Sequence, residues 1–107
     1  MNIPTVIAAL VEAQNKYNSA DYGNCFSETS VVFDEGGVHT GRDAIKQWFE
    51  KANEKYRTVM DPITFNTTGS QWVLTARISG TFAGSPIVLN YTFEMHNGLI
   101  QTLKITD

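Results

Sequence analysis

The sequence predicts an α+β domain in which helices cover one face of an antiparallel sheet. In the first half of the chain, apolar residues recur at spacings of three and four, which is typical of helices. From Arg57 onward, apolar residues alternate with polar ones, which is typical of strands. The chain has 107 residues and shows no linker or internal repeat, so we expect residues 1–107 to form a single domain.

The composition is that of a globular protein and excludes several classes of partner. Apolar residues make up 42% and charged residues 18%, which argues against disorder. The net charge is −3 and no run of like charge exists, so we expect neither nucleic acid nor a membrane as partner. The apolar run at residues 6–11 is too short for a signal peptide or a membrane span, which favours a cytoplasmic protein. Cys25, the only cysteine, is expected to be a small buried side chain.

Three helices are predicted in the first half. The first runs from about Pro4 to Asn18, because proline suits a helix start. A short second helix is predicted around residues 21–26. The third follows Thr40, which has the spacing of a capping pair with Asp43. The predicted buried stripe of the third helix consists of Ile45, Trp48, Phe49, Ala52 and Tyr56.

Four strands are predicted in the second half, at residues 63–65, 72–82, 87–95 and 99–105. Asn97-Gly98 is the strongest turn signal, because a type I′ turn needs positive φ at both central residues. Short connections imply antiparallel neighbours and therefore a four-stranded meander. The apolar faces that we expect to pack on the helices are Trp72, Leu74, Ala76 and Ile78 in one strand and Ile87, Leu89, Tyr91, Phe93 and Met95 in the next.

Asp34 is the first candidate for chemistry. The short apolar strand at residues 31–33 runs directly into it, and a glycine turn and a second short strand follow. Alternation places Asp34 on the same side as Val32. If that side is internal, burial disfavours the ionised carboxylate, which is how a general base is tuned. The alternative is that Asp34 accepts backbone hydrogen bonds from the turn, as aspartate often does.

Three other residues bear on this candidate. Glu35 should point the other way, as a solvated turn residue. His39, on the return strand, either lies at the surface or shares a proton with Asp34. Tyr91 lies on an apolar strand face, where its hydroxyl group is either structural or donates a hydrogen bond to a developing oxyanion.

Other site types are not supported. Neither His39 nor His96 has metal-ligand spacing, so we expect no metal. The glycine-rich segment at residues 36–42 lacks the lysine of a phosphate loop, and Asp43 would place a negative charge where phosphate should bind. We therefore expect no bound cofactor.

Several segments together resemble one known family. They are Tyr17-Asn18-Ser19-Ala20-Asp21, Phe26-Ser27-Glu28, Val31-Val32-Phe33-Asp34, Gly41-Arg42-Asp43-Ala44-Ile45, Trp48-Phe49, residues 80–86, Phe93 and Asn97-Gly98-Leu99-Ile100. In these segments the chain is similar to the SnoaL-like branch of the NTF2-like superfamily, which includes ketosteroid isomerases and polyketide cyclases. The resemblance covers nearly the whole chain. It implies a cone, in which a curved sheet wraps on about three helices, with an apolar pocket at the open end and a homodimer through the exposed sheet face.

The resemblance also implies roles for particular residues. In ketosteroid isomerases a carboxylate at the position of Asp34 moves a proton at the carbon next to a carbonyl group. A tyrosine of the first helix and a protonated aspartic acid of a late strand bind the oxyanion. The helix position falls near Ala13, so Tyr17, one turn later, is the substitute, and the strand position falls on Tyr91. The segment between Asp21 and Phe26 is shorter than the family usually has.

Three functions follow from these expectations. The first is an isomerase-type or cyclase-type enzyme acting on a small apolar carbonyl compound, with Asp34 as general base, Tyr91 and Tyr17 stabilising negative charge and His39 tuning Asp34. The expected pocket lining is Phe33, Trp48, Trp72, Leu89 and Phe93. The second is a module that binds a small apolar molecule without chemistry. The third is a dimeric interaction domain whose cone is filled by its own side chains.

Overall fold

The computed structural model describes residues 2–107. Within this range it contains three helices, α1 (Thr5–Asn15), α2 (Ser19–Asn24) and α3 (Arg42–Tyr56). The same range contains six strands, β1 (Phe26–Asp34), β2 (Gly37–Thr40), β3 (Val59–Thr68), β4 (Gln71–Ser79), β5 (Ile87–His96) and β6 (Leu99–Thr106).

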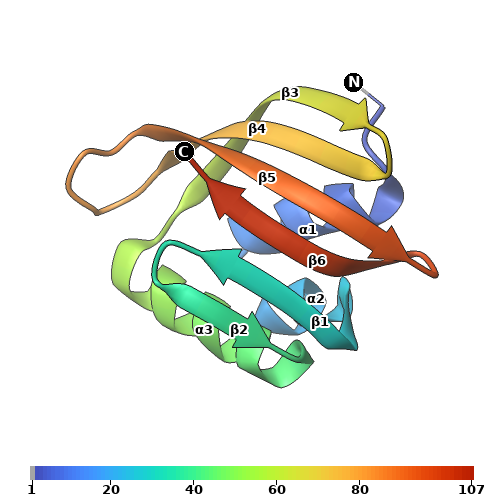
Figure 1. The fold of residues 1–107 in the computed structure, drawn as a ribbon. Coiled ribbons are helices and arrows are strands. Elements are labelled where there is room, and N and C mark those ends of the chain that lie inside the picture. Colours follow the sequence, from blue (N-terminus) through green and yellow to red (C-terminus); the bar gives the residue numbers. More distant parts are fainter. Residues whose placement is uncertain (1) are drawn as a thin grey trace.

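The strands form one curved sheet that lies over the helices (Figure 1). Their order is β2-β1-β6-β5-β4-β3, so the predicted meander of β3 to β6 is confirmed, and so is the α+β cone. The sheet is mixed, because β1 and β6 are parallel whereas every other neighbouring pair is antiparallel. This one pairing joins the helical half of the chain to its strand-rich half.

The first helix ends three residues before the predicted boundary. Its C-cap is Lys16, and Tyr17 follows with φ +55°. The amide groups of Tyr17 and Asn18 donate to the carbonyl oxygens of Gln14 and Ala13, at 3.2 and 2.9 Å. This pattern satisfies the last carbonyl groups of the helix and reverses the chain. The Asn18 side chain then caps α2 by accepting from the Asp21 amide at 3.0 Å, so α2 begins earlier than expected.

The predicted cap of the third helix is wrong. The N-cap of α3 is Gly41, with φ +91° and no side-chain hydrogen bond. Thr40 is the last residue of β2 and pairs with Val31, so its backbone is committed to the sheet. A β-carbon at Gly41 would lie 3.3 Å from the Glu28 carbonyl oxygen, and this φ favours glycine.

The strand boundaries differ from the predicted ones by more than one residue at three ends. β3 extends on both sides of residues 63–65, and β4 ends at Ser79 rather than at Phe82. Beyond Ser79, the Gly80 amide donates to the Ser85 hydroxyl group at 2.9 Å, which closes a loop instead of continuing the ladder. The turn at Asn97-Gly98 is as predicted, because both residues have positive φ, +53° and +78°.

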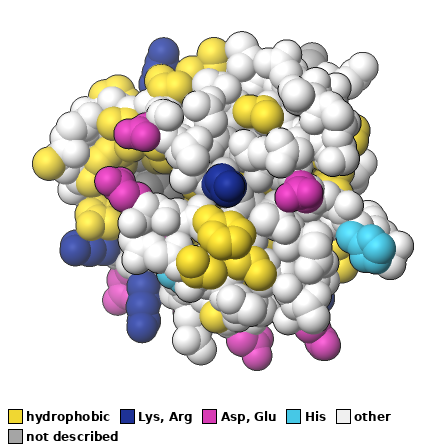
Figure 2. All heavy atoms as spheres, in the orientation of Figure 1, with side chains coloured by type: hydrophobic (Ala, Val, Ile, Leu, Met, Phe, Trp, Pro, Cys, Tyr) yellow, Lys and Arg dark blue, Asp and Glu magenta, His cyan; other side chains and the backbone are white. Residues whose placement is uncertain are grey.

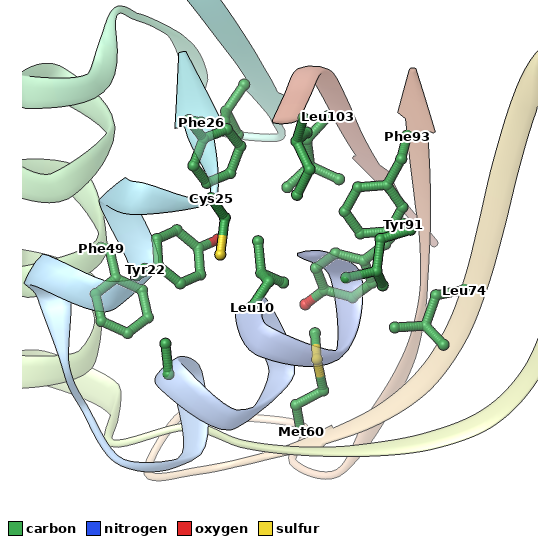
Figure 3. Packing of buried hydrophobic residues seen from close by; sticks show 14 of the residues in the cluster. Leu10, Tyr22, Cys25, Phe26, Phe49, Met60, Leu74, Tyr91, Phe93 and Leu103 are labelled. Atoms are coloured by element: carbon green, nitrogen blue, oxygen red, sulfur yellow. The ribbon is translucent and has the colours of Figure 1, made fainter. Parts of the chain in front are cut away.

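The interior of the cone is filled by side chains from the helices and the sheet (Figure 3). Leu10 of α1 lies between the aromatic rings contributed by α2 and those contributed by β5. The predicted inward faces are confirmed for β4 and for β5 beyond its first residue, where Leu74, Ala76, Ile78, Tyr91 and Phe93 are buried, whereas Ile87 is exposed. Burial of these apolar groups is the main term that holds the helices against the sheet.

Candidate functional site

The β1–β2 hairpin brings Asp34 and His39 together. Val32 is fully buried on the inner face, and alternation places Asp34 on the same face at the end of β1. Val32 pairs with His39 across the hairpin, so the imidazole ring lies beside the carboxylate. His39 Nε2 and Asp34 Oδ1 are 3.5 Å apart. The side chains are 23% and 19% exposed, so the pair lies at the edge of the interior.

The two facing atoms have no other partner. Asp34 Oδ1 and His39 Nε2 are both buried, and neither makes a hydrogen bond to any atom of residues 2–107. The alternative expectation, that Asp34 is held by backbone hydrogen bonds from the turn, therefore fails for this oxygen. Buried polar atoms without hydrogen bonds are rare in folded proteins, because they lose their interactions with water without replacement. Such atoms are concentrated at functional sites.

A chain of aromatic rings connects this pair to the core. Trp48 of α3 stacks on His39, with ring centroids 4.9 Å apart and planes 24° apart. The ring centroids of Trp48 and Tyr22 are 6.4 Å apart, and Tyr22 stacks on Phe49 with centroids 4.0 Å apart. The stack sets the imidazole ring against an aromatic face at the edge of the core.

Strand register places Asp34 and Tyr91 in one row across the sheet. Phe33 pairs with Lys104 in the parallel β1–β6 ladder, so the next position sets Asp34 beside Ile105. Ile105 in turn pairs with Tyr91 of β5. Because neighbouring strands lie about 4.8 Å apart, the two backbones are about 10 Å apart with Ile105 between them. A carboxylate and a phenol thus face the same interior across one aliphatic residue.

Two phenols in this interior are held in the neutral form. Burial raises the pKa of Tyr22 well above its usual range, and the nearby Tyr91, Cys25 and Asp34 add to the rise. Burial also raises the pKa of Tyr91, and the Gln14 side chain acts in the opposite direction. A neutral phenol is a hydrogen-bond donor, which is what a developing oxyanion requires.

Three of the predicted site residues lie elsewhere. Tyr17 is an exposed residue after α1, and the Arg57 guanidinium lies over its ring at 5.1 Å. Phe33 points to the outer face of the sheet, where Lys104 lies over its ring at 6.0 Å. Trp72 stacks on Phe65 near the β3–β4 turn, at the end of the sheet opposite to Asp34. Phe33 cannot line the same interior as Asp34, because consecutive strand residues face opposite sides of the sheet.

The other predicted lining residues are on the inner face, where they form core. Phe93 is fully buried and Leu89 is half-buried against the core. Two surface hollows, of about 330 and 270 Å³, lie between α1 and α2 and at the start of α3. Neither hollow is lined by Asp34, His39 or Tyr91. The acid–base pair therefore stands at the rim of a packed interior.

Three residues of this arrangement were not singled out from the sequence. Tyr22 lies in the largely polar segment Ser19–Asn24, which contains a glycine. Only its position about one helical turn before Phe26 could have indicated that it is buried. Ile105 and Gln14 read as ordinary strand and helix residues. Their positions depend on the β1–β6 pairing and on the packing of α1, which no local pattern encodes.

Neither a metal-binding cluster nor a membrane-spanning helix is found in the described part of the chain. Residues 2–107 contain no group of three or more His, Cys, Asp or Glu side chains that could hold a metal ion. No helix in this range is long and apolar enough to cross a membrane.

Solved structures similar to this chain share its fold. A Sinorhizobium meliloti protein described as a "putative polyketide cyclase" has a TM-score of 0.93 and 30% identity, over 97% of this chain and 95% of its own. A Catenulispora acidiphila protein of ketosteroid isomerase-like fold, in complex with trimethylamine, has a TM-score of 0.87 and 17% identity, over 99% of this chain and 87% of its own. An NTF2-like protein of unknown function from Cytophaga hutchinsonii has a TM-score of 0.81 and 16% identity, over 99% of this chain and 93% of its own.

No protein-family model and no curated protein matches the sequence. The two structures below 25% identity establish the fold alone. The Sinorhizobium protein adds sequence similarity over almost the full length of both chains. On this ground the chain belongs to the SnoaL-like branch of the NTF2-like superfamily, with polyketide cyclase and ketosteroid isomerase-like relatives.

Proposed function

We propose that the protein is a proton-transfer enzyme of the isomerase or cyclase type that acts on a small apolar carbonyl compound. The contact between Asp34 Oδ1 and His39 Nε2 carries this proposal, because two buried polar atoms without other partners cost stability, and a catalytic role is one reason for a protein to retain them. The relatives named above are consistent with this class of chemistry.

In the proposed reaction, Asp34 takes a proton from the carbon next to the carbonyl group. The electrons of the broken C–H bond form an enolate, whose negative charge develops on the carbonyl oxygen. Tyr91 donates a hydrogen bond to that oxygen, and His39 holds the carboxylate. In isomerisation, the enolate then regains the proton from Asp34 at a different carbon. In ring closure, the enolate carbon bonds to a second carbonyl carbon, the π electrons of that carbonyl group move to its oxygen, and this oxygen takes the proton from Asp34.

The geometry suits a small substrate that meets the pair at its exposed edge. About one fifth of each side chain is exposed, so a ligand can reach the carboxylate without unfolding the cone. Trp48 and Ile105 provide the neighbouring apolar surface. An apolar compound would replace water there and strengthen the interactions of the pair with the developing charge.

Deuterium exchange tests this function without knowledge of the natural substrate. A panel of small enolisable ketones, including a β,γ-unsaturated cyclic ketone, would be incubated in D₂O and followed by proton NMR. We expect Asp34→Asn to reduce exchange at the carbon next to the carbonyl group by about 10²–10⁴-fold, the usual contribution of a general base. Glu35→Gln is the matched control, because it removes the adjacent, exposed carboxylate and should leave exchange unchanged. Equal rates in wild type and Asp34→Asn would overturn the proposal.

The filled interior favours a second candidate, a dimeric interaction domain without chemistry. Tyr22, Phe26 and Phe93 are fully buried in the space that an open cone would leave to a ligand. The outer face of the sheet, seen in Figure 2, is largely uncharged, with isolated charged side chains. Its polar groups partly satisfy one another, as where Thr75 Oγ1 donates to Asn90 Oδ1 at 2.8 Å. Such a face suits a second copy of the chain.

The oligomeric state tests the second candidate. Thr92 and Lys104 are paired across β5 and β6 on the outer face. Thr92→Lys would set two ammonium groups side by side there, and in a face-to-face dimer the repulsion would be doubled. We expect a concentration-dependent dimer for wild type in analytical ultracentrifugation and a monomer for the variant. A wild-type monomer, or an unaffected dimer, would exclude this face as the interface.

A further inference from the structure

The two edges of the sheet differ in length. β2 forms one edge and has four residues, whereas β3 forms the other and has ten. Figure 1 shows β3 as the outermost strand, with β4 on one side only. The backbone groups on the open side of an edge strand can pair with a strand of another chain, so folded proteins usually protect such an edge.

The first half of β3 is protected. The Asn15 side chain of α1 takes the place of a neighbouring strand at Met60: its Nδ2 donates to the Met60 carbonyl oxygen at 2.9 Å, and its Oδ1 accepts from the Met60 amide at 2.7 Å. Pro62 has no N–H group to offer. The ladder with β4 also shifts register between Pro62 and Thr64, and such an irregularity bends the strand. A further strand therefore has no regular edge to pair with in this half.

The second half of β3, residues 64–68, has a regular open edge. It pairs with β4 without a further shift of register. The turn that follows has two residues, so Thr68 and Gln71 close the hairpin as a hydrogen-bonded pair. Hydrogen-bonded and non-bonded pairs alternate along an antiparallel ladder. The N–H and C=O groups of Phe65 and Thr67 therefore point away from β4.

These outward groups have no partner in the described part of the chain. No turn or loop of residues 2–107 makes a backbone hydrogen bond to Phe65 or Thr67. Four of the five side chains at residues 64–68 are exposed, and Phe65 is half-buried where it stacks on Trp72, with ring centroids 5.9 Å apart. What fits such an edge is an extended strand, which offers N–H and C=O groups at the same spacing.

We infer that residues 64–68 pair with the same residues of a second copy of the chain, antiparallel, about a two-fold axis at Asn66. Phe65 then lies opposite Thr67 of the second copy, and each pair exchanges both backbone hydrogen bonds. Asn66 faces its own counterpart, and Thr64 faces Thr68.

The sequence of this half favours a second copy over another peptide. Hydroxyl groups of opposed threonines can hydrogen-bond across strands, and so can the two opposed Asn66 amides. A two-fold axis brings identical side chains together, so a charge near Asn66 would be repelled by its own copy. Residues 62–70 contain no charged side chain, although the chain as a whole has a net charge of −3. The segment is therefore complementary to itself.

This pairing is independent of the proposed function and of the outer face of the sheet. It extends the sheet sideways, leaves Asp34 and His39 untouched and leaves Thr92 uncovered. One strand of each copy takes part, and interfaces that bury less than about 1,200 Å² are typically weak. We therefore expect the pairing at the concentrations used for NMR and not at the dilution used for ultracentrifugation.

Amide hydrogen exchange tests the inference. In ¹⁵N-labelled protein at low concentration, the Phe65 and Thr67 amides should exchange rapidly with D₂O, while the Asn66 amide, bonded to β4, is the protected internal control. At a concentration where about nine tenths of the chains are paired, exchange at Phe65 and Thr67 should slow by about tenfold, because it occurs only from unpaired chains. Exchange that does not depend on concentration would overturn the inference.

Two variants test the register and the choice of partner. Thr67→Pro removes an outward N–H group and takes no donor from the β3–β4 ladder, so the Phe65 amide should lose its concentration dependence. If this variant fails to fold, Asn66→Lys sets two ammonium groups across the axis and should have the same effect, whereas the matched control Asn66→Gln should still pair. Thr92→Lys, on the outer face, should also still pair. Pairing that survives Asn66→Lys would overturn the two-fold register, and equal protection by a Thr-Val repeat peptide would overturn the choice of a second copy.

Discussion

Replacing Asp34 with asparagine should stabilise the protein, since the carboxylate is in an unfavourable place. Its Oδ1 atom is buried, has His39 Nε2 at 3.5 Å and accepts no hydrogen bond from residues 2–107. Asparagine has nearly the same shape and no charge, so it removes the desolvation of the carboxylate. Relief of such functional-site strain is commonly worth about 0.5–2 kcal/mol. In a domain of this size, 1 kcal/mol moves Tm by about 4–8 °C.

Urea unfolding at neutral pH, followed by tryptophan fluorescence, measures this change. Trp48 stacks on His39, so one of the two tryptophans reports directly on the site. The control is Glu35→Gln, which neutralises an exposed neighbour and should change the free energy of unfolding by less than about 0.5 kcal/mol. A loss of about 1–3 kcal/mol in Asp34→Asn would refute the reasoning, because it would show a carboxylate that the fold needs.

Three further predictions concern stability. Burial raises the pKa of the Cys25 thiol from 9.0 to about 11, so its contribution to stability is complete below pH 9 and is lost as pH rises through 11. Cys25→Ala should therefore remove about 3 kcal/mol from the alkaline loss of stability, as measured by urea titrations at stepped pH. Tyr22→Leu should reduce the free energy of unfolding by about 2–4 kcal/mol, since it leaves a cavity beside Phe49; a change under 1 kcal/mol would show that the stack contributes little. Arg57→Gly should raise Tm by a few degrees, because the backbone of Arg57 has φ +48°, which is strained for a residue other than glycine by about 0.5–1 kcal/mol. The contact of Arg57 with the exposed Tyr17 ring contributes less than this strain, and a lowered Tm would show that the contact contributes more.

Much of the fold follows from local sequence, and particular residues show why. Asn97-Gly98 predicted its turn because few residue pairs tolerate positive φ at two successive positions. Leu74 and Phe93 predicted the inner faces of β4 and β5, because alternation is fixed by strand geometry. The sequence allowed His39 to lie either at the surface or beside Asp34, and the register of the β1–β2 hairpin places it beside Asp34.

The candidate site could be predicted only in part, because its assembly is not local. Tyr17 was expected in the first helix, yet the helix ends before it, and the αL conformation turns its ring toward Arg57. The roles suggested for Tyr91 and His39 remain predictions. What brings Tyr91 into line with Asp34 is the register of three strands, one of which was not expected to be parallel.

The parallel pairing of β1 with β6 also sets the order in which the protein can become functional. β1 belongs to the first third of the chain and β6 contains its last strand residues, so their ladder closes the largest loop between neighbouring strands of the sheet. Contacts between residues so far apart in sequence slow folding, because chain entropy is lost before they form. Helices and the meander can form from local contacts, but the row from Asp34 to Tyr91 exists only after β6 has docked between β1 and β5. Formation of the candidate site therefore reports on completion of folding, and a ligand that bound there would select fully folded chains.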